Sequence, residues 1–238
     1  MKFNAKLRLT IKHIPILGKL IKRVITYFKN IEFPGSENYW ERRYKTGGTS
    51  GPGSYNRLAK YKADVLNQFV KDEGINEVIE FGCGDGNQLS YASYPNYIGL
   101  DISKSALVLC IKKYKNDPTK SFFLYNSESF CDKKGIFKAA LVLSLDVIYH
   151  LVEDKVFYKY ITDLFIASRK YVIIYSSDYD SPLSFHIRDR NFTKHVKENV
   201  KEYELIEVIK NKYPIDEKDP ENTSKADYFI YKRVESSF

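Results

Sequence analysis

The sequence predicts one α/β domain with a mostly parallel sheet, and three observations lead to this prediction. Short apolar runs of strand length alternate with segments of helical periodicity from Glu77 onward. Most of these runs are nearly continuous in apolar residues, as expected for parallel strands covered on both faces. The last two runs flank a loop with Pro214 and Pro220, which predicts a closing antiparallel pair.

The elements follow in a regular order. Strands are expected at Glu77–Phe81, Tyr97–Asp101, Ser121–Tyr125, Ala139–Leu145, Tyr171–Ser176, Tyr203–Ile209 and Tyr228–Val234. Helices are expected at Asn56–Val70, Ser103–Tyr114 and Asp154–Ala167. The predicted architecture is therefore a Rossmann-like, seven-stranded, mostly parallel sheet with an antiparallel terminal hairpin and an N-terminal helical arm.

Charge is distributed unevenly along the 238 residues. The net charge is +8, yet residues 1–30 alone carry eight Lys or Arg and no acidic residue. The rest of the chain holds 30 basic and 30 acidic side chains, so it is neutral. A neutral body lacks the positive surface that phosphate-backbone binding needs, which argues against a nucleic-acid partner.

The N-terminal arm, residues 1–36, is basic and amphipathic. Leu17, Leu20, Ile21, Val24 and Ile25 recur near the helical period, with Lys and Arg between them. It resembles neither a secretory signal nor a membrane span, because charges interrupt the apolar run. Two interpretations stay open: contact of residues 1–30 with an anionic membrane surface, or packing on the domain or on a second subunit.

Three cysteines, Cys83, Cys110 and Cys131, form no CxxC pair. This usage fits a reducing compartment and provides neither a disulfide framework nor a zinc site. We expect a cytoplasmic protein, at the inner face of the membrane if the arm binds lipid.

The most informative segment is Val78-Ile79-Glu80-Phe81-Gly82-Cys83-Gly84-Asp85-Gly86-Asn87. A buried strand leads into three glycines at alternate positions, which let the backbone turn sharply and approach a ligand. We expect a helix to follow and to direct its free N–H groups at the same ligand. The ligand is expected in the crevice at the carboxyl ends of the strands.

A dinucleotide fingerprint places its third glycine three residues after the second, whereas Gly86 follows Gly84 by two. The E-x-G-x-G-x-G form from Glu80 to Gly86 resembles motif I of class I S-adenosylmethionine (SAM)-dependent methyltransferases. The resemblance spans residues 39–235 and is strongest at 78–101 and 139–151. It implies SAM as cofactor, S-adenosylhomocysteine (SAH) as its product, and contacts from Glu80, Gly82, Cys83, Gly84 and Gly86.

The ends of the next strands agree with this resemblance. Asp101 ends the second strand, where a carboxylate accepts the ribose hydroxyls of a nucleoside. Ile102 and Ser103 are expected near the adenine ring. Ser103 is also expected to cap the next helix. The adenine amine is assigned to Asn126, Ser127 or Glu128, and the sequence does not choose among them. After the fourth strand, Leu145 and Asp146 flank the methionine part.

The segment 37–70 is expected to be a lid on a domain that spans residues 37–238. Its Tyr-Trp-Glu-Arg-Arg-Tyr, Gly-Gly-x-Ser-Gly-x-Gly-Ser-Tyr and Arg-Leu-Ala-x-Tyr-Lys-Ala runs resemble bacterial small-molecule methyltransferases of surface-polysaccharide (capsule) pathways. By this analogy Ser54, Tyr55 and Arg57 touch the cofactor, with Arg57 on the methionine carboxylate. The alternative is a surface loop followed by a packing helix.

On the acceptor side, His150 is the candidate general base for a hydroxyl. Tyr39 and Tyr149 are expected to contact the substrate. His186, Arg188 and Arg190 form a candidate clamp for an anionic substrate, and a solvated helix start is the alternative. The sequence contains no carboxylate–histidine cluster that would predict a metal site.

The sequence therefore predicts an O-methyltransferase acting on a small polar or phosphorylated metabolite in surface-glycan synthesis, including a phosphate or phosphoramidate modification. A methyltransferase of protein or nucleic acid, and a non-catalytic SAM-fold binding subunit, remain alternatives. The oligomeric state is not predicted.

Overall fold

In a computed structural model of the chain, residues 33–234 are described. The predicted N-terminal arm lies almost entirely outside these residues. Residues 35–234 belong to one compact unit. Its elements are α3 (Ser36–Lys45), η1 (Pro52–Ser54), α4 (Asn56–Asp72), β1 (Glu77–Phe81), η2 (Gln88–Tyr91), β2 (Asn96–Asp101), α5 (Lys104–Lys113), β3 (Lys120–Leu124), β4 (Ala139–Leu145), η3 (Ile148–His150), α6 (Asp154–Ile166), β5 (Ser168–Ser176), α7 (Phe192–Asn199), β6 (Tyr203–Ile209) and β7 (Asp227–Arg233).

The strands form one sheet in the order β3-β2-β1-β4-β5-β7-β6. Strands β1 to β5 pair in parallel, and β7 runs antiparallel to both β5 and β6. The predicted fold class, including the closing antiparallel pair, is confirmed. The order reverses between β1 and β4, so a crevice opens there at the carboxyl ends of the strands.

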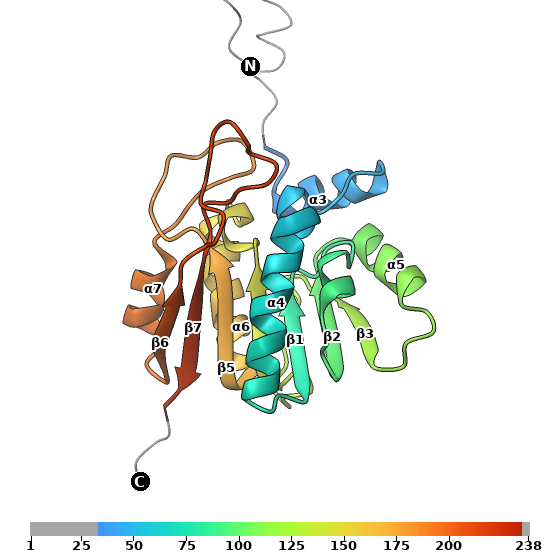
Figure 1. Cartoon of the computed structure of the whole chain (residues 1–238), viewed down its shortest axis with the longest axis vertical. Coiled ribbons are helices and arrows are strands. Elements are labelled where there is room, and N and C mark those ends of the chain that lie inside the picture. The colour runs from blue at the N-terminus through green and yellow to red at the C-terminus, as the bar shows by residue number, and fades with distance from the viewer. Residues whose placement is uncertain (1–32, 235–238) are drawn as a thin grey trace, which may run out of the picture. The chain divides into compact units, whose positions relative to one another are not determined.

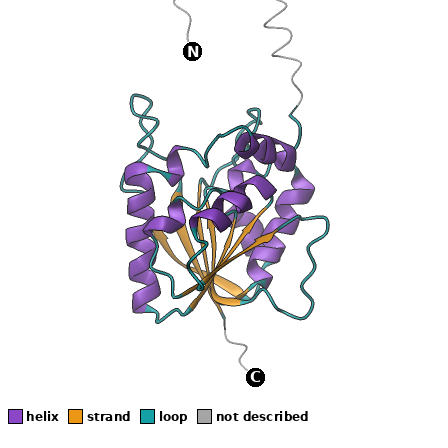
Figure 2. Cartoon of the chain, turned by 90° about the vertical axis from the view of Figure 1, so that its right-hand side faces the viewer, coloured by secondary structure: helices purple, strands orange, loops and turns teal. Residues whose placement is uncertain are grey.

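Helices cover both faces of the sheet (Figure 2). One apolar cluster joins the sheet to α6 and α7, through residues such as Phe157, Leu164 and Phe192. A second joins the opposite face to α4 and α5, through residues such as Leu66, Val70 and Leu107. In α4, which crosses in front of β1 (Figure 1), buried residues recur at helical spacing, as the sequence predicted.

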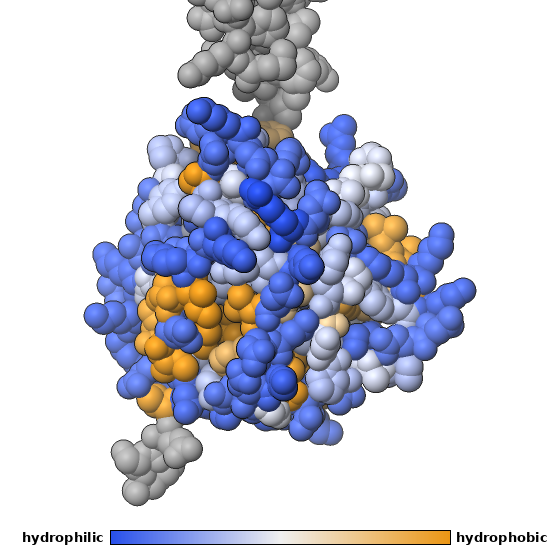
Figure 3. Space-filling model, viewed as in Figure 1, coloured by the Kyte–Doolittle hydropathy of each residue, from blue (hydrophilic) through white to orange (hydrophobic). Residues whose placement is uncertain are grey.

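The edge strand β6 exposes Leu205, Ile206 and Val208. An apolar area lies over β6 and β7 in the space-filling view (Figure 3). A register shift between Leu205 and Glu207 interrupts the pairing of β6 with β7. Such bulges protect an edge strand against pairing with another chain.

One predicted element is wrong. No α-helix follows the glycine loop: the chain between β1 and β2 forms only the short 3₁₀ helix η2. The segment from Gly82 to Pro95 contains three glycines at its start and a proline at its end, which leaves little room for helical turns. Helix-dipole stabilisation of a ligand at this loop is therefore expected to be small.

No helix within residues 33–234 is both long and apolar enough to cross a membrane.

Candidate active site

A cavity that is partly open to solvent lies at the carboxyl ends of β1, β2 and β4. Ten of the predicted cofactor and catalytic residues line it: Ser54, Glu80, Gly82, Cys83, Gly84, Asp101, Ile102, Leu145, Asp146 and His150. Three strand ends thus bring together residues that are up to 70 positions apart in sequence. This is the place where an open α/β sheet binds a ligand.

The glycine loop has a backbone that side chains would block. Gly82, Gly84 and Gly86 have φ of 86°, 57° and 69°. A Cβ on Gly84 would lie 2.3 Å from Ser50 Oγ, and a Cβ on Gly82 would lie 2.4 Å from Val147 Cγ2. The loop therefore needs glycine both for its left-handed turns and for close approach of neighbouring segments.

Asp101 is held by backbone donors. Its Oδ2 accepts a hydrogen bond from Gly84 N and its Oδ1 from Ser103 N, each at 2.8 Å. Burial raises the pKa of this carboxyl to about 6. Ser103 caps α5, accepting a hydrogen bond from Ala106 N at 3.1 Å as the sequence predicted. Asp101 therefore has a fixed orientation toward the cavity and is ionised at neutral pH.

Glu80 lies deeper in the cavity wall. It accepts a 2.6 Å hydrogen bond from Tyr97 Oη, and burial raises its pKa to about 7. Cys83, on the same loop, has a thiol pKa raised by a hydrogen bond with Cys110 and by burial. A thiol of this kind stays protonated and unreactive.

Sequence analysis missed Lys62, which lies on α4 with a fully buried side chain. Its Nζ is 2.6 Å from Asp146 Oδ2 and 5.3 Å from the ring centre of Tyr175. Tyr149 Oη donates to the other oxygen, Asp146 Oδ1, at 2.8 Å. Asp146 itself has φ of 60°, so its side chain is aimed at the cavity by a strained backbone and two partners.

Gln88 is the second residue that sequence analysis missed. Its Nε2 donates to Ala59 O at 2.9 Å, while its buried Oε1 has no partner among residues 33–234. Gln88 lines the cavity. An unpaired buried acceptor is costly, so this oxygen is suited to accept a hydrogen bond from a ligand. The only sequence signal was its position directly after the glycine loop.

The segment before α4 covers the cavity. Ser50 N and Tyr55 Oη donate to Asp85 Oδ2 at 2.9 and 2.8 Å, and Tyr44 Oη contacts Ser50 Oγ at 2.9 Å. Trp40, Tyr44, Ser50 and Ser54 line the cavity. These contacts attach the predicted lid segment to the glycine loop. Tyr55 thus binds Asp85 of the glycine loop and does not itself line the cavity.

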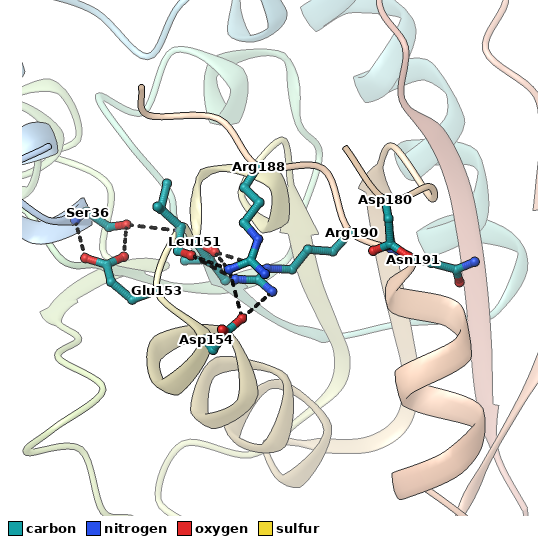
Figure 4. A network of polar contacts seen from close by, with 9 residues as sticks. Ser36, Leu151, Glu153, Asp154, Asp180, Arg188, Arg190 and Asn191 are labelled. Carbon is teal, nitrogen blue, oxygen red and sulfur yellow. Dashed lines mark hydrogen bonds and ion pairs between the residues drawn. The ribbon is translucent and has the colours of Figure 1, made fainter. Parts of the chain in front are cut away.

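Helix α3 of the predicted lid is attached at its N-terminus and near its middle. Ser36 N and Oγ donate to Glu153 at 2.8 and 2.6 Å (Figure 4). Glu41 accepts hydrogen bonds from Ser103 Oγ, Ser105 N and Ser105 Oγ at 2.7–3.0 Å, and these lower its pKa to about 2. The lid is therefore tied to the loop that holds Asp101.

Arg57 does not have the position expected for a ligand of the methionine carboxylate. Its guanidinium donates to Asn222 O at 2.7 Å, pairs with Asp219 at 3.0 Å and stacks on Tyr213 at 4.6 Å. Its guanidinium contacts the loop between β6 and β7 and does not line the cavity. Arg57 is exposed, whereas Lys62 on the same helix is buried.

Five rings form a wall beside the cavity, which we call the ring wall: Tyr39, Trp40, Tyr149, His150 and His186. His186 stacks on Tyr39 at 4.4 Å and on His150 at 5.3 Å between ring centres. Trp40 and Tyr149 contact His150 at 4.9 and 4.6 Å. Trp40 and His150 line the cavity, and the other three rings pack behind them.

The predicted anion clamp needs correction, because the structure separates its members. Arg188 and Arg190 pair with Asp154 at 3.0 and 2.6 Å and donate to the carbonyls of Leu151 and Val152 (Figure 4). Both guanidinium groups thus fix the segment before α6, and neither lines the cavity. Only His186 stays near the site.

The candidates for the adenine amine also lie outside the cavity lining. Asn126 Nδ2 donates to Glu37 at 2.9 Å, its Oδ1 caps the turn at Glu128 N, and Glu128 pairs with Lys155 on the surface. Ser127 has no contact with the cavity either. The preceding Tyr125 lines it instead.

No protein-family model and no curated protein matches the sequence. Solved structures do match the fold. The N-methyltransferase NodS from Bradyrhizobium japonicum WM9, in complex with SAH, has a TM-score of 0.65 at 11% identity, covering 84% of this chain and 100% of that chain. Magnesium protoporphyrin IX methyltransferase ChlM from Synechocystis PCC 6803, with bound SAH, has 0.57 at 14%, covering 90% and 100%.

The methyltransferase domain of bacterial CtHen1-C has a TM-score of 0.59 at 19% identity, covering 74% of this chain and 99% of that chain. These structures agree in fold while their names point to different substrates. The described part of the chain has the fold of class I SAM-dependent methyltransferases.

Proposed function

We propose that this protein is a SAM-dependent methyltransferase that transfers a methyl group to an oxygen of a small molecule and leaves SAH. The observation that carries the proposal is the charge of the cavity. Asp101 lines it as an ionised carboxylate, and Glu80, Asp146 in its ion pair with Lys62, and the unpaired Gln88 Oε1 lie beside it. No Lys or Arg of residues 33–234 is among the lining side chains. Such a lining favours a cation, and SAM carries a sulfonium and an ammonium group.

The residues present fit this cofactor. Asp101 offers its carboxylate to the two ribose hydroxyls, and each such charge-assisted hydrogen bond contributes about 1.5–3 kcal/mol. Gln88 Oε1 and Asp146 offer acceptors to the ammonium group. Gly82 and Gly84 leave the space that a side chain would fill. When bound, SAM supplies the electrophilic methyl group, and the protein aligns the acceptor and excludes water.

The lid contributes the exclusion of water. Its contacts with Asp85, Glu153 and the Ser103–Ser105 segment close the cavity over the glycine loop. A ligand the size of SAM enters only when some of these contacts open. His150 is left on the acceptor side, with its ring against Trp40.

The narrower resemblance of the Glu37–Val70 segment supports a small acceptor from surface-glycan (capsule) synthesis. The fold match to CtHen1-C raises the alternative of a nucleic-acid acceptor. The neutral composition of residues 31–238 and the absence of basic residues from the described cavity lining favour the small molecule.

The test is incubation with isotopically labelled SAM and a panel of hydroxylated metabolites, sugars and nucleotide sugars, each read by mass spectrometry for the gain of one methyl group. Asp101→Ala is the matched variant and is expected to lose methyl transfer together with SAM affinity. Methyl transfer by Asp101→Ala at the wild-type rate would contradict the site. Methylation of RNA with none of the small molecules would favour the alternative.

A further inference from the structure

The surface around α5 and β3 carries a charge that the neutral composition of residues 31–238 conceals. Residues 104–138 contain three acidic residues and eight lysines: Lys104, Lys112, Lys113, Lys115, Lys120, Lys133, Lys134 and Lys138. The rest of residues 31–238 holds 22 basic and 27 acidic side chains. The body of the protein is therefore divided into a basic segment with a net charge of +5 and a remainder with a net charge of −5.

The three acidic side chains of this segment do not neutralise its lysines. Asp132 accepts hydrogen bonds from two backbone N–H groups of its own loop, and Glu128 pairs with Lys155 of α6. Asp117 lies 3.7 Å from Lys120. None of the other seven lysines of the segment forms an ion pair with a carboxylate of residues 33–234. Their charges are thus available to an anionic partner.

Large apolar side chains are exposed on the same segment. Val108, Ile111 and Ile136 are each more than half exposed, and Phe123 and Leu124 of β3 are exposed as well. Six of the 17 large apolar side chains exposed among residues 33–234 lie in these 35 residues. They are therefore concentrated here, and a concentration of exposed apolar side chains indicates an interaction surface.

Helix α5 and strand β3 present these side chains on one edge of the molecule. Strand β3 is the edge strand of the sheet, and its Phe122 stacks on Tyr114, at the end of α5, with 5.7 Å between ring centres. Leu124 follows Phe122 by two residues and lies on the same side of the strand. In α5, Val108 and Ile111 are three residues apart and share one exposed stripe.

The loop after β3 extends this edge. Phe123 lies on the opposite side of β3 from Phe122, and its ring centre is 5.2 Å from that of Phe137, next to Ile136. Helix α5 and β3 occupy the same side of the molecule (Figure 1), and an apolar area bordered by hydrophilic side chains lies over α5 (Figure 3). The surface formed by Val108, Ile111, Phe123, Leu124, Ile136 and the seven unpaired lysines is called the α5–β3 face below.

A lipid surface with anionic headgroups fits this composition. Such a surface attracts lysines electrostatically, and apolar side chains between them enter the boundary between headgroups and acyl chains. Nucleic-acid and protein interfaces favour Arg, and protein interfaces are poor in Lys. Residues 104–138 contain eight Lys and no Arg. Exposed apolar side chains also add nothing to the binding of a phosphate backbone, because its contacts are polar.

We propose that the α5–β3 face binds the surface of an anionic phospholipid membrane. The unpaired lysines contact the headgroups, and the five apolar side chains enter the headgroup region. Tyr125, directly after β3, lines the cavity, so this face adjoins the candidate active site. The inference goes beyond the proposed function and does not depend on it.

The first test concerns the charge of the face. Full-length protein is sedimented with vesicles of phosphatidylcholine alone and of phosphatidylcholine mixed with phosphatidylserine, and we expect binding to the mixed vesicles. Lys133→Gln/Lys134→Gln is expected to weaken it about tenfold or more, because each lysine near an anionic surface contributes about fivefold. The control Lys194→Gln/Lys197→Gln removes the same charge from exposed positions of α7 and is expected to change binding less than about twofold.

The second test leaves the charge unchanged. Val108→Ser/Ile136→Ser removes two exposed apolar side chains of the face and is expected to weaken binding to the mixed vesicles about fivefold or more. Ile206→Ser/Ile215→Ser is the matched control, with side chains 50% and 59% exposed in other parts of the surface, and should leave binding unchanged. Thermal unfolding followed by circular dichroism checks that each variant is folded.

Equal binding to both kinds of vesicle would overturn the proposal, and so would binding that neither pair of substitutions on the face weakens, since it would then arise elsewhere in the chain, for example from residues 1–30. Polyuridylate is titrated in parallel. Binding of this RNA that Lys133→Gln/Lys134→Gln weakens, without binding to the mixed vesicles, would replace the lipid by a nucleic acid. A dimer in sedimentation velocity that Val108→Ser/Ile136→Ser dissociates, again without vesicle binding, would replace it by a second copy of the chain.

Discussion

Replacing Lys62 with methionine removes the cation from a buried ion pair and nearly preserves the volume of the side chain. Lys62 is 0% exposed and Asp146 12% exposed, with 2.6 Å between Nζ and Oδ2. After the change Asp146 keeps only the hydrogen bond from Tyr149. Breaking one side of a buried pair costs about 3–5 kcal/mol, because the remaining charge stays desolvated.

For a domain of this size each kcal/mol lowers the melting temperature by about 2–4 °C, so Lys62→Met is expected to lower it by roughly 6–20 °C. The measurement is urea unfolding followed by circular dichroism, with the melting temperature as a second readout. Lys60→Met is the matched control, since Lys60 lies on the same helix and is exposed.

The double variant Lys62→Met/Asp146→Asn completes the cycle. Once the charge on Asp146 is gone, its desolvation penalty disappears, and much of the lost stability is expected to return. A loss below about 1 kcal/mol in Lys62→Met, or a double variant no more stable than the single one, would refute the reasoning that this pair is structurally required.

Three further changes test other parts of the site. SAM affinity is expected to fall about tenfold per pH unit below about pH 6. Burial raises the pKa of Asp101 to about 6, and the protonated carboxyl must lose its proton to bind the cofactor. Glu80, whose pKa is about 7, acts in the same direction. Affinity by calorimetry that is constant from about pH 5 to 8 would contradict this. Gly84→Ala places a Cβ 2.3 Å from Ser50 Oγ and should weaken SAM binding about tenfold or more. Gly74→Ala is the control, because Gly74 has a similar φ of 60° and no atom near the added Cβ, and it should leave SAM affinity unchanged. Equal SAM affinities for the two variants would argue against the contact between Gly84 and Ser50. Glu41→Ala should destabilise the protein by about 0.5–2 kcal/mol at neutral pH, as loss of a helix cap does. Because hydrogen bonds lower the Glu41 pKa from 4.5 to about 2, this contribution is present above about pH 4.5 and is lost as the pH falls toward 2, so denaturation curves of wild type and variant should converge in acid; a difference that persists at low pH would count against it.

Much of the fold is predictable from local patterns. The limits of β1, β4 and β6 agree with the expected ranges, because long apolar runs between turn residues leave few alternatives for a buried strand. The residues of the glycine loop and of the β2 and β4 ends also converge in the cavity as expected, because parallel topology alone places these strand ends together.

The missed features depend on tertiary contacts that no local pattern encodes. Lys62 is a lysine on the buried face of α4, and its role depends on Asp146, which follows β4 and pairs with it in the folded chain. Arg57, five positions earlier, has the same charge and turns instead to the β6–β7 loop. Arg188 and Arg190 resembled an anion clamp in sequence, yet both pair with Asp154 and neither lines the cavity.

The central claim is that the acidic cavity above the glycine loop binds SAM. Isothermal titration of the full-length protein with SAM, with NAD as the competitor ligand, tests it most directly. We expect SAM to bind with one molecule per chain, and NAD to give no heat. Absence of SAM binding, or binding of NAD in its place, would contradict the account.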